Sequence, residues 1–188
     1  MAGRSRPQGP PPPEQDPDAD PESVARAILL RQLTMGPRSR HQLEQKLRDR
    51  KVPEDVSAAL LARFEDVGLV DDAEFARMWV RSRGETRSLG RAALRRELGE
   101  KGIKGETAEE ALDELTPEAE EHSARRLLAR RMRPFDRADP AARDKELRRL
   151  VGMLARKGHA PGTAFRLAAE ALGDTGQVDD GEVGFEPN

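Results

Sequence analysis

The fold is decided by residues 94–103, which read Leu-Arg-Arg-Glu-Leu-Gly-Glu-Lys-Gly-Ile. Leu94 and Leu98 are four residues apart, so a helix places them one turn apart on the same face, where both can be buried. Gly102 follows where this helix would end, because glycine adopts the left-handed conformation that closes a helix at little cost. The stretch therefore predicts a helix with an apolar stripe and a defined end.

The same pattern occurs twice more, at intervals of about 50 residues. The other leucine pairs are Leu43 with Leu47 and Leu150 with Leu154, and each is followed by a break and a second amphipathic segment. Pro53 and Pro161 stand near the start of that segment, where a helix tolerates proline. A third helix precedes each pair. The predicted starts of the first two helices of the repeats are Glu22–Ser23, Ser39 with Gln42, Asp71 with Glu74, Ser88 or Leu89, and Thr116 with Pro117.

These patterns predict an all-α protein, with about nine helices in three tandem three-helix, helix-turn-helix-like repeats that pack into an elongated, curved rod. Sustained alternation of apolar and polar residues, the signal for strands, is missing from the sequence. The expected divisions are a disordered, proline-rich acidic tail at 1–22, repeats at 23–70, 71–115 and 116–173, and a disordered acidic tail at 174–188.

Charge is distributed unevenly along the 188 residues, although the net charge is only −2. Residues 1–22 carry two arginines against five acids, and residues 174–188 carry five acids and no base. The middle of the chain is therefore basic. Since 36% of all residues are hydrophobic and only 3% are aromatic, a deep core around a buried active site is not expected.

Composition also excludes several kinds of chemistry. The chain contains no cysteine, which rules out disulfides, thiolate zinc sites and cysteine nucleophiles. The histidines His41, His122 and His159 fall in different repeats and are predicted at the surface or at helix ends. We expect no enzyme activity, no cofactor and no metal site. Without a candidate membrane span or signal peptide, the expected location is the cytoplasm.

Arginine spacing provides the candidate site. Many arginines recur at intervals of four on the predicted helices, so they form basic faces suited to a polyanionic partner. Each arginine by itself is more simply explained as a solvated residue with local ion pairs. The candidate partner-binding residues, with those of the middle repeat first, are Arg77, Arg81, Arg83, Arg87, Arg91, Arg95, Arg126, Arg130, Arg133, Arg148 and Arg149.

Five prominent residues of the middle repeat are given structural roles instead. Asp71 is predicted to cap a helix, and Phe75, Leu94 and Leu98 to lie in the core. Trp79 follows Phe75 at an interval of four, which favours a core position over a platform for stacking bases. Arg126, Arg130, Arg133 and Arg137 would form one basic stripe if the third repeat's first helix extends that far.

The middle of the chain resembles the RecX family. The resemblance rests on Leu69-Val70-Asp71-Asp72-x-x-Phe75-Ala76-x-x-Trp79-Val80-x-x-Arg83, then Gly90 and Leu94-x-x-Glu97-Leu98-x-x-Lys101-Gly102-Ile103. Upstream, Ser39-Arg40-x-x-Leu43-x-x-Lys46-Leu47 is similar to the family's first-repeat motif, and the likeness covers residues 24–172. Two departures are Lys51, where the family usually has glycine, and His159, where it usually has an aromatic residue.

The resemblance implies a regulator of RecA recombinase in homologous recombination, DNA repair and the SOS response. Such a protein lies along the RecA–DNA filament and limits filament growth, ATPase, strand exchange and co-protease activity. Its partners would be the RecA filament and, weakly or through the filament, single-stranded DNA. From the residues themselves we expect no membrane contact, and we expect a monomer because the sequence has no heptad seam and no large unexplained apolar face. The alternative is a stand-alone DNA-binding protein built from tandem helix-turn-helix-like modules.

Overall fold

The computed structural model describes residues 20–173, so most of the two predicted acidic tails lies outside the described residues. The first helix takes in Pro21 and Glu22, which the sequence analysis assigned to the tail. It begins there because the Asp20 carboxylate accepts a hydrogen bond from the backbone N–H of Ser23, while Pro21 occupies the first turn. The predicted start at Glu22–Ser23 was therefore slightly late.

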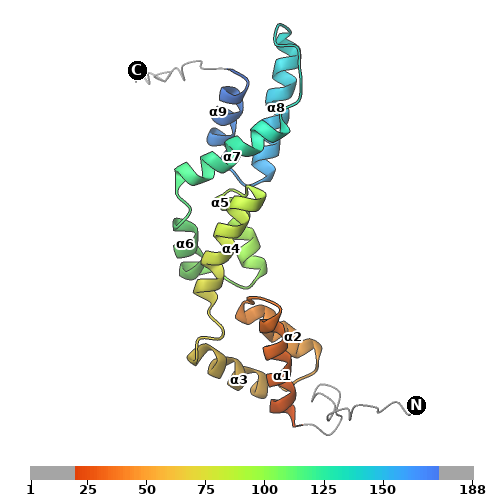
Figure 1. Ribbon diagram of the computed structural model, residues 1–188, viewed down its shortest axis with the longest axis vertical. Coiled ribbons are helices and arrows are strands. Elements are labelled where there is room, and N and C mark those ends of the chain that lie inside the picture. The colour runs from red at the N-terminus through yellow and green to blue at the C-terminus, as the bar shows by residue number, and fades with distance from the viewer. Residues whose placement is uncertain (1–19, 174–188) are drawn as a thin grey trace, which may run out of the picture. The chain divides into compact units, whose positions relative to one another are not determined.

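Within residues 20–173 the chain forms nine α-helices and no strands (Figure 1), which confirms the predicted all-α fold of helical repeats. The helices are α1 (Pro21–Thr34), α2 (Arg40–Asp49), α3 (Glu54–Asp66), α4 (Asp72–Arg87), α5 (Arg91–Glu100), α6 (Gly105–Asp113), α7 (Pro117–Arg131), α8 (Pro140–Arg156) and α9 (Pro161–Ala171).

The chain divides into two compact units. Described residues 20–86 and Leu94–Leu115 form unit 1, while Arg87–Ala93 and described residues 116–173 form unit 2. Helix α5 contributes its first turn to unit 2 and its remaining residues to unit 1. The three repeats predicted from the sequence are defined by their helices and not by the contacts that divide the chain into two units. Their boundaries therefore stay a prediction.

Leucine pairs anchor the cores of both units. All six leucines of the repeated pattern are 0% exposed. In unit 1, α1, α2 and α3 pack around Leu43 and Leu47 together with Leu29 and Leu60. In unit 2, α9 packs against α7 and α8, and the core includes the Leu150 and Leu154 pair. The periodic spacing thus identified the buried faces correctly.

The break after α5 packs against the start of α2 within unit 1. Ser39 caps α2 through the predicted reciprocal hydrogen bonds with Gln42, and its hydroxyl also donates to the Lys101 carbonyl at 2.7 Å. A Cβ atom on Gly102 would lie 2.3 Å from His41 Cβ, and Gly102 has a φ of 82°. Glycine is therefore required here both by conformation and by the close neighbour.

A similar joint lies within unit 2, where the break after α8 packs against residues 88–93. The N–H of Gly90 donates to the Lys157 carbonyl at 2.9 Å, and that of Ala92 donates to the Gly158 carbonyl at 3.2 Å. A Cβ atom on Gly158 would lie 2.3 Å from the backbone nitrogen of Ala93. Backbone atoms, and not a movable side chain, therefore enforce glycine at this position.

One sequence prediction fails at this joint. The predicted start of a helix at Ser88 or Leu89 is wrong: α5 begins at Arg91, because Ser88 has a left-handed φ of 50°. His159, predicted at the surface or at a helix end, lies between the end of α8 and the start of α9 and is 4% exposed. Its ring nitrogens lie 3.0 Å from Glu120 Oε1 and 3.2 Å from the Ser88 carbonyl oxygen. A buried polar side chain is tolerated here because it has these partners.

Candidate basic interface

The arginines of α4 are tied to acids near them. Asp71 starts this helix by accepting a hydrogen bond from the Glu74 N–H at 2.8 Å, as predicted. Arg77 donates from Nε and Nη2 to Glu74 Oε2 at 3.1 and 2.9 Å, and this hydrogen bonding is the main cause that raises the pKa of Arg77. Arg81 Nη2 lies 3.8 Å from the second oxygen of Glu74. The Glu74 carboxylate thus pairs with both Arg77 and Arg81.

Arg95 is likewise paired, with an acid on another helix. Its Nε and Nη2 atoms donate to the two carboxylate oxygens of Glu109 on α6 at 2.7 and 2.6 Å. This bidentate contact is the main cause that raises the pKa of Arg95. The pair joins α5 to α6, so a structural contact already uses this guanidinium.

Trp79 is half-buried and covered by cations. Its ring stacks on Phe75 with 5.6 Å between centroids, while the Arg83 guanidinium lies 4.2 Å and Lys101 Nζ 5.1 Å from the ring centroid. The indole N–H donates to Glu97 at 2.9 Å. Cations on an indole are held by the ring's negative face. Arg83 is therefore engaged with Trp79, while Phe75, Leu94 and Leu98 are buried.

Arg87 and Arg91 belong to the joint in unit 2. The Arg87 carbonyl accepts a hydrogen bond from Lys157 Nζ at 2.9 Å, and the Arg91 N–H donates to Glu120 Oε1 at 3.3 Å. The backbones of both residues therefore help to position the segment that packs against Gly158.

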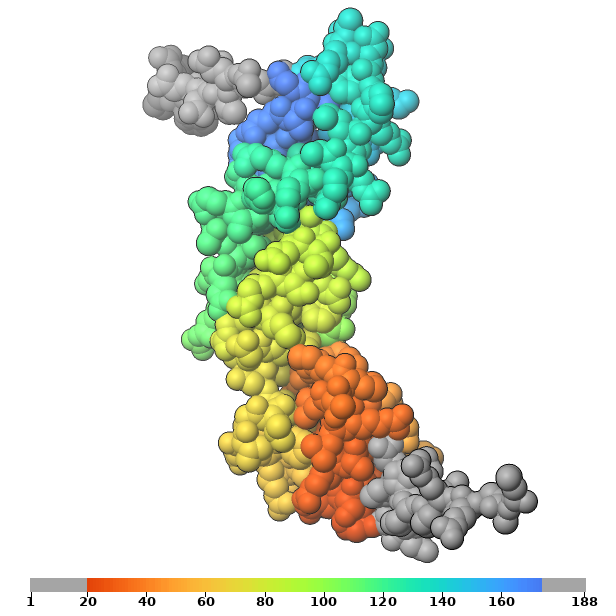
Figure 2. All heavy atoms as spheres, viewed as in Figure 1, coloured from red at the N-terminus to blue at the C-terminus, as the bar shows by residue number. Residues whose placement is uncertain are grey.

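Three arginines of unit 2 differ from those of α4 and α5. Arg126 and Arg130 lie one turn apart on α7, and Arg148 lies on α8; all three are exposed. Within residues 20–173, no acidic side chain forms an ion pair with any of these three. Side chains of α7, of α8 and of the segment between them reach the surface in Figure 2, where they are coloured green-blue to cyan. These cations are available to a partner.

The predicted four-residue stripe on α7 is interrupted. Helix α7 ends at Arg131 and Met132 has extended backbone angles, so Arg133 and Arg137 follow the helix instead of continuing its face. The turn is fixed by Glu146, which is 6% exposed and accepts the Arg133 backbone N–H at 3.0 Å. Arg133 thus helps to end the helix through its backbone, while its exposed side chain stays in the candidate set.

Arg149 completes this turn. Its Nε and Nη2 atoms donate to the two Glu146 oxygens at 2.7 and 2.5 Å, and Nη2 also donates to the Arg131 carbonyl at 2.7 Å. The Arg149 guanidinium is the main cause that lowers the pKa of Glu146 to about 2, with the Arg133 N–H also contributing. Arg149 therefore joins α8 to the end of α7, in contrast to the exposed Arg148 beside it.

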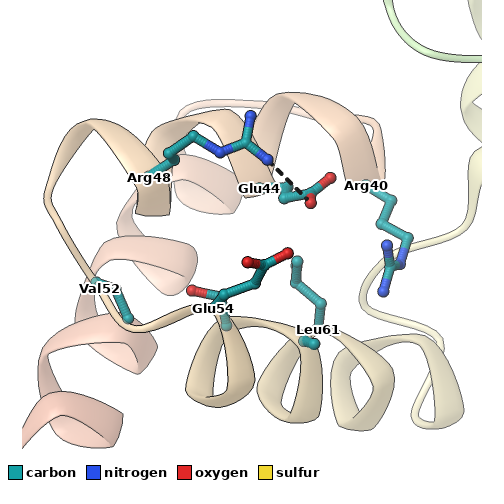
Figure 3. A pocket seen from close by; sticks show the side chains of 8 residues that line it. Arg40, Glu44, Arg48, Val52, Glu54 and Leu61 are labelled. Carbon is teal, nitrogen blue, oxygen red and sulfur yellow. Dashed lines mark hydrogen bonds and ion pairs between the residues drawn. The ribbon is translucent and has the colours of Figure 1, made fainter.

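Pockets in unit 1 include residues that the sequence analysis did not select. A cavity of about 350 Å³ between α2 and α3 is lined by residues including Arg40, Glu44, Arg48 and Glu54 (Figure 3). Its arginines are paired: Arg48 with Glu44 at 3.3 Å, and Arg40 with Glu65 at 2.9 Å. This cavity therefore carries charges of both signs.

A second pocket, of about 430 Å³, lies between α1 and α2. Its described lining includes four basic residues, Arg31, Arg38, Lys46 and Arg50. The spacing of Lys46, in the last turn of α2, and Arg50, directly after that helix, was a usable sequence signal. The other two could not be found from periodicity, because folding brings them there from α1 and from the connection after it.

Neither a metal-binding cluster nor a membrane-spanning helix is found among the described residues. Over residues 20–173, no group of three or more histidine, aspartate or glutamate side chains is placed to hold a metal ion. None of the nine helices in that range is both long and apolar enough to cross a membrane.

Known proteins are similar to this chain over most of its length. Residues 25–64 match the family model described as "RecX, first three-helix domain", and residues 71–112 match "RecX, second three-helix domain". The chain is 46% identical over 172 residues to Regulatory protein RecX of Streptomyces coelicolor, covering 90% of both chains. It is 47% identical over 157 residues to that of Thermobifida fusca, covering 82% of this chain and 83% of the relative.

Solved structures agree with the sequence relatives. The crystal structure of RecX from Lactobacillus salivarius superposes with a TM-score of 0.70 at 25% identity, covering 81% of this chain and 97% of that one. A second crystal structure, of regulatory protein RecX, gives a TM-score of 0.69 at 25% identity, with 83% and 74% of the two chains covered.

Proposed function

The chain belongs to the RecX family, and from this premise we propose that it regulates RecA recombinase by binding along the RecA–DNA filament. Bound there, it limits filament growth and lowers ATPase, strand-exchange and co-protease activity. The observation that carries the proposal is the 46% identity to a named regulatory protein over nine-tenths of both chains. Relatives this similar over nearly their whole length share a fold and commonly a partner.

The exposed arginines of unit 2 support a polyanionic partner. Arg126, Arg130 and Arg148 would provide the main contacts, since no ion pair within the described residues competes for them. Arg133 is added through its exposed side chain. In this proposal Arg77, Arg81, Arg95 and Arg149 mainly stabilise the protein itself, because each already binds a carboxylate. A filament presents both acidic protein surface and DNA phosphates, which suits cations of this kind.

The same arginines favour a second candidate, a stand-alone DNA-binding protein. Contacts to backbone phosphates would dominate its affinity, which would then fall by about 0.9 log units per log unit of salt for each phosphate neutralised on a duplex. The two candidates differ in the partner that is bound tightly: the filament in the first, naked DNA in the second.

The test is a titration of the full chain into a RecA ATPase assay on single-stranded DNA. We expect inhibition at concentrations below that of the recombinase, because one regulator that limits growth affects many filament subunits. Anisotropy of labelled single-stranded DNA, measured in parallel without recombinase, gives the affinity for naked DNA. We expect this affinity to be at least tenfold weaker than that for the filament.

Absence of inhibition at tenfold molar excess of folded protein would overturn the regulator proposal. If ATPase activity were unaffected and naked DNA bound tightly with a steep salt dependence, the stand-alone DNA-binding protein would be supported instead. Circular dichroism of the same sample establishes that the protein in the assay is folded.

A further inference from the structure

A pocket of unit 2 lies at the turn between α7 and α8. We call it the Phe135 pocket; it holds about 250 Å³, and its described lining is Ala129, Met132, Arg133, Pro134, Phe135 and Arg137. Two cations, an aromatic ring and apolar side chains therefore meet in one small space. The α2–α3 cavity of Figure 3 is built differently, because glutamates line it together with the arginines.

The two arginines of the Phe135 pocket are available to a ligand. Arg133 and Arg137 are exposed, and within residues 20–173 neither of them forms an ion pair. Asp136 lies between them in the sequence, but its Oδ1 atom accepts the Ala138 N–H at 2.9 Å and closes the turn. Over the described part of the chain, the charge of this pocket is therefore not neutralised by a carboxylate in contact with either guanidinium.

Phe135 gives the pocket an anchored aromatic ring. The side chain is half-buried, since it packs against the core of unit 2 and also lines the pocket. The Arg137 guanidinium carbon lies 5.9 Å from the ring centroid. A ring anchored in this way presents a fixed apolar surface next to a cation.

The turn that carries these side chains is held by hydrogen bonds. The Met132 N–H donates to the Leu128 carbonyl at 2.8 Å, and the Arg133 N–H donates to buried Glu146 at 3.0 Å. Groups that are already ordered lose less conformational entropy when a ligand binds. The arrangement of the pocket is therefore set before any ligand arrives.

We propose that the Phe135 pocket binds one nucleotide of a single-stranded nucleic acid. The base lies against Phe135 and Met132, and the adjacent phosphate contacts Arg133 and Arg137. Sites for single strands combine cations that follow the backbone with aromatic rings on which bases stack. The planar fork of a guanidinium also matches two phosphate oxygens.

The size and the lining of the pocket favour this ligand over others. Pockets that enclose drug-sized ligands hold about 300–1,000 Å³, so this smaller pocket suits one unit of a chain whose remainder lies on the surface. An acidic protein segment would use the two cations but not the ring. A duplex keeps its bases stacked inside, whereas a single strand can offer one of them to Phe135.

This inference rests on the proposed function only for the expectation that single-stranded DNA is present. It adds a contact with a base to the phosphate contacts expected of the exposed arginines. Its test contains no recombinase, so a failure of this inference and a failure of the regulator proposal are distinguishable.

The experiment measures binding of the full chain to two fluorescein-labelled probes by anisotropy, between about 50 and 200 mM salt. One probe is a twenty-nucleotide oligothymidylate, and the other has the same length and phosphates but abasic sites in place of the bases. The variants are Phe135→Leu, which keeps apolar bulk without the ring, Phe135→Tyr, which keeps the ring, Arg133→Ala and Arg137→Ala. Circular dichroism and thermal unfolding establish that each variant is folded.

Two matched controls come from the same unit. Phe165→Leu removes a ring of α9 that is 56% exposed and is not part of the described lining of the pocket. Arg125→Ala removes a guanidinium that lies 3.1 Å from Glu121 and 3.3 Å from Glu170. Exposure of an aromatic ring and loss of one positive charge are thereby separated from membership of the pocket.

We expect Phe135→Leu to weaken binding of oligothymidylate about fivefold, because one base loses its stacking partner. Binding of the abasic probe should change less than twofold, and Phe135→Tyr should bind both probes like wild type. Arg133→Ala and Arg137→Ala should each weaken binding of both probes about three- to tenfold, with a slope of log affinity against log salt that is shallower by about 0.7. Both controls should change affinity less than twofold.

An equal effect of Phe135→Leu on the two probes would overturn the proposal, as would arginine variants that match Arg125→Ala. If Phe135→Leu does not fold, the arginine variants decide, since both side chains are exposed. Unchanged DNA binding with weaker binding to the recombinase would assign the pocket to an acidic protein surface, which also overturns it. If DNA binding changes as expected while wild-type protein fails to inhibit ATPase activity, the pocket stands and the regulator proposal falls.

Discussion

The arginines of α4 and α5 and those of α7 and α8 have similar spacing in the sequence but different surroundings in the structure. Arg77, Arg81 and Arg95 each face a carboxylate at 3.8 Å or less. Arg126 and Arg130 have no such partner within residues 20–173. Clustered positive charge is therefore not by itself evidence of a binding surface. What matters is whether the protein's own acids already neutralise it.

Arg149 is an exception among the candidate arginines of α7 and α8, because its guanidinium is paired. Arg149 lies in unit 2 beside the exposed Arg148, yet it binds both oxygens of Glu146. Glu146 is buried, whereas Glu74 and Glu109 are exposed enough for water to compete. The comparison therefore predicts a large effect on stability at Glu146 and small effects at the exposed pairs.

The largest expected effect follows Glu146→Ala. The substitution leaves the Arg149 guanidinium without its carboxylate and the Arg133 N–H without an acceptor, so we expect a loss of about 3 kcal/mol in the free energy of unfolding. Urea titration followed by circular dichroism measures this loss. Glu74→Ala is the control, with an expected loss below about 1 kcal/mol. Equal losses for Glu146→Ala and Glu74→Ala would show that burial of the carboxylate does not determine how much each ion pair stabilises the protein.

Acid should remove part of the same stabilisation. The folded-state pKa of Glu146 is lowered to about 2 from 4.5, so its contribution is present above about pH 4.5 and is lost as the pH falls towards 2. Between pH 5 and pH 3 we expect a loss of about 2 kcal/mol from this group. The measurement is the difference between wild type and Glu146→Gln in urea titrations at each pH. A difference independent of pH would contradict the assignment.

A smaller effect is expected at the pair that joins α5 to α6. Both Arg95 and Glu109 are about half exposed, so a double-mutant cycle with Arg95→Ala and Glu109→Ala should give a coupling free energy of about 0.2–1 kcal/mol. The coupling should decrease at high salt, because exposed charges are screened. A coupling of several kcal/mol would mean that α5 and α6 depend on this pair far more than its exposure indicates.

Much of the fold could be predicted from local patterns. Leucines four residues apart lie in the cores because helical periodicity decides which side is buried, and the predicted caps Ser39, Asp71 and Thr116 accept backbone hydrogen bonds as expected. Ser88 and His159 could not be predicted, since both are positioned by a contact between residues about 70 apart in the chain. Their roles follow from tertiary packing and not from any local signal.

One departure from the family pattern, at Lys51, shows the same limit. Lys51 has a left-handed φ of 59° where glycine would be less strained, but its side chain is exposed. The corresponding Gly158 cannot be replaced without a clash against Ala93. Sequence alone finds both breaks, because a break needs only a residue that ends a helix. It does not reveal which break has a neighbour packed against it.

The sequence indicates which helices are rich in arginine, but not which of their arginines are already paired with an acid. Glu74, three residues before Arg77, is a local signal for an ion pair on a helix. The partner of Arg95, in contrast, is fourteen residues away on another helix, so only folding brings the two side chains together. The spacing of arginines therefore locates helices rich in arginine, but could not separate paired guanidinium groups from exposed ones.

The most direct test of this separation compares two triple variants with equal loss of charge in the RecA ATPase assay. One is Arg126→Ala with Arg130→Ala and Arg148→Ala; the other is Arg77→Ala with Arg81→Ala and Arg95→Ala. We predict that the first raises the half-inhibitory concentration at least tenfold, about 1.4 kcal/mol, and that the second raises it less than threefold while both remain helical. Equal effects, or a larger effect of the second variant, would contradict the account.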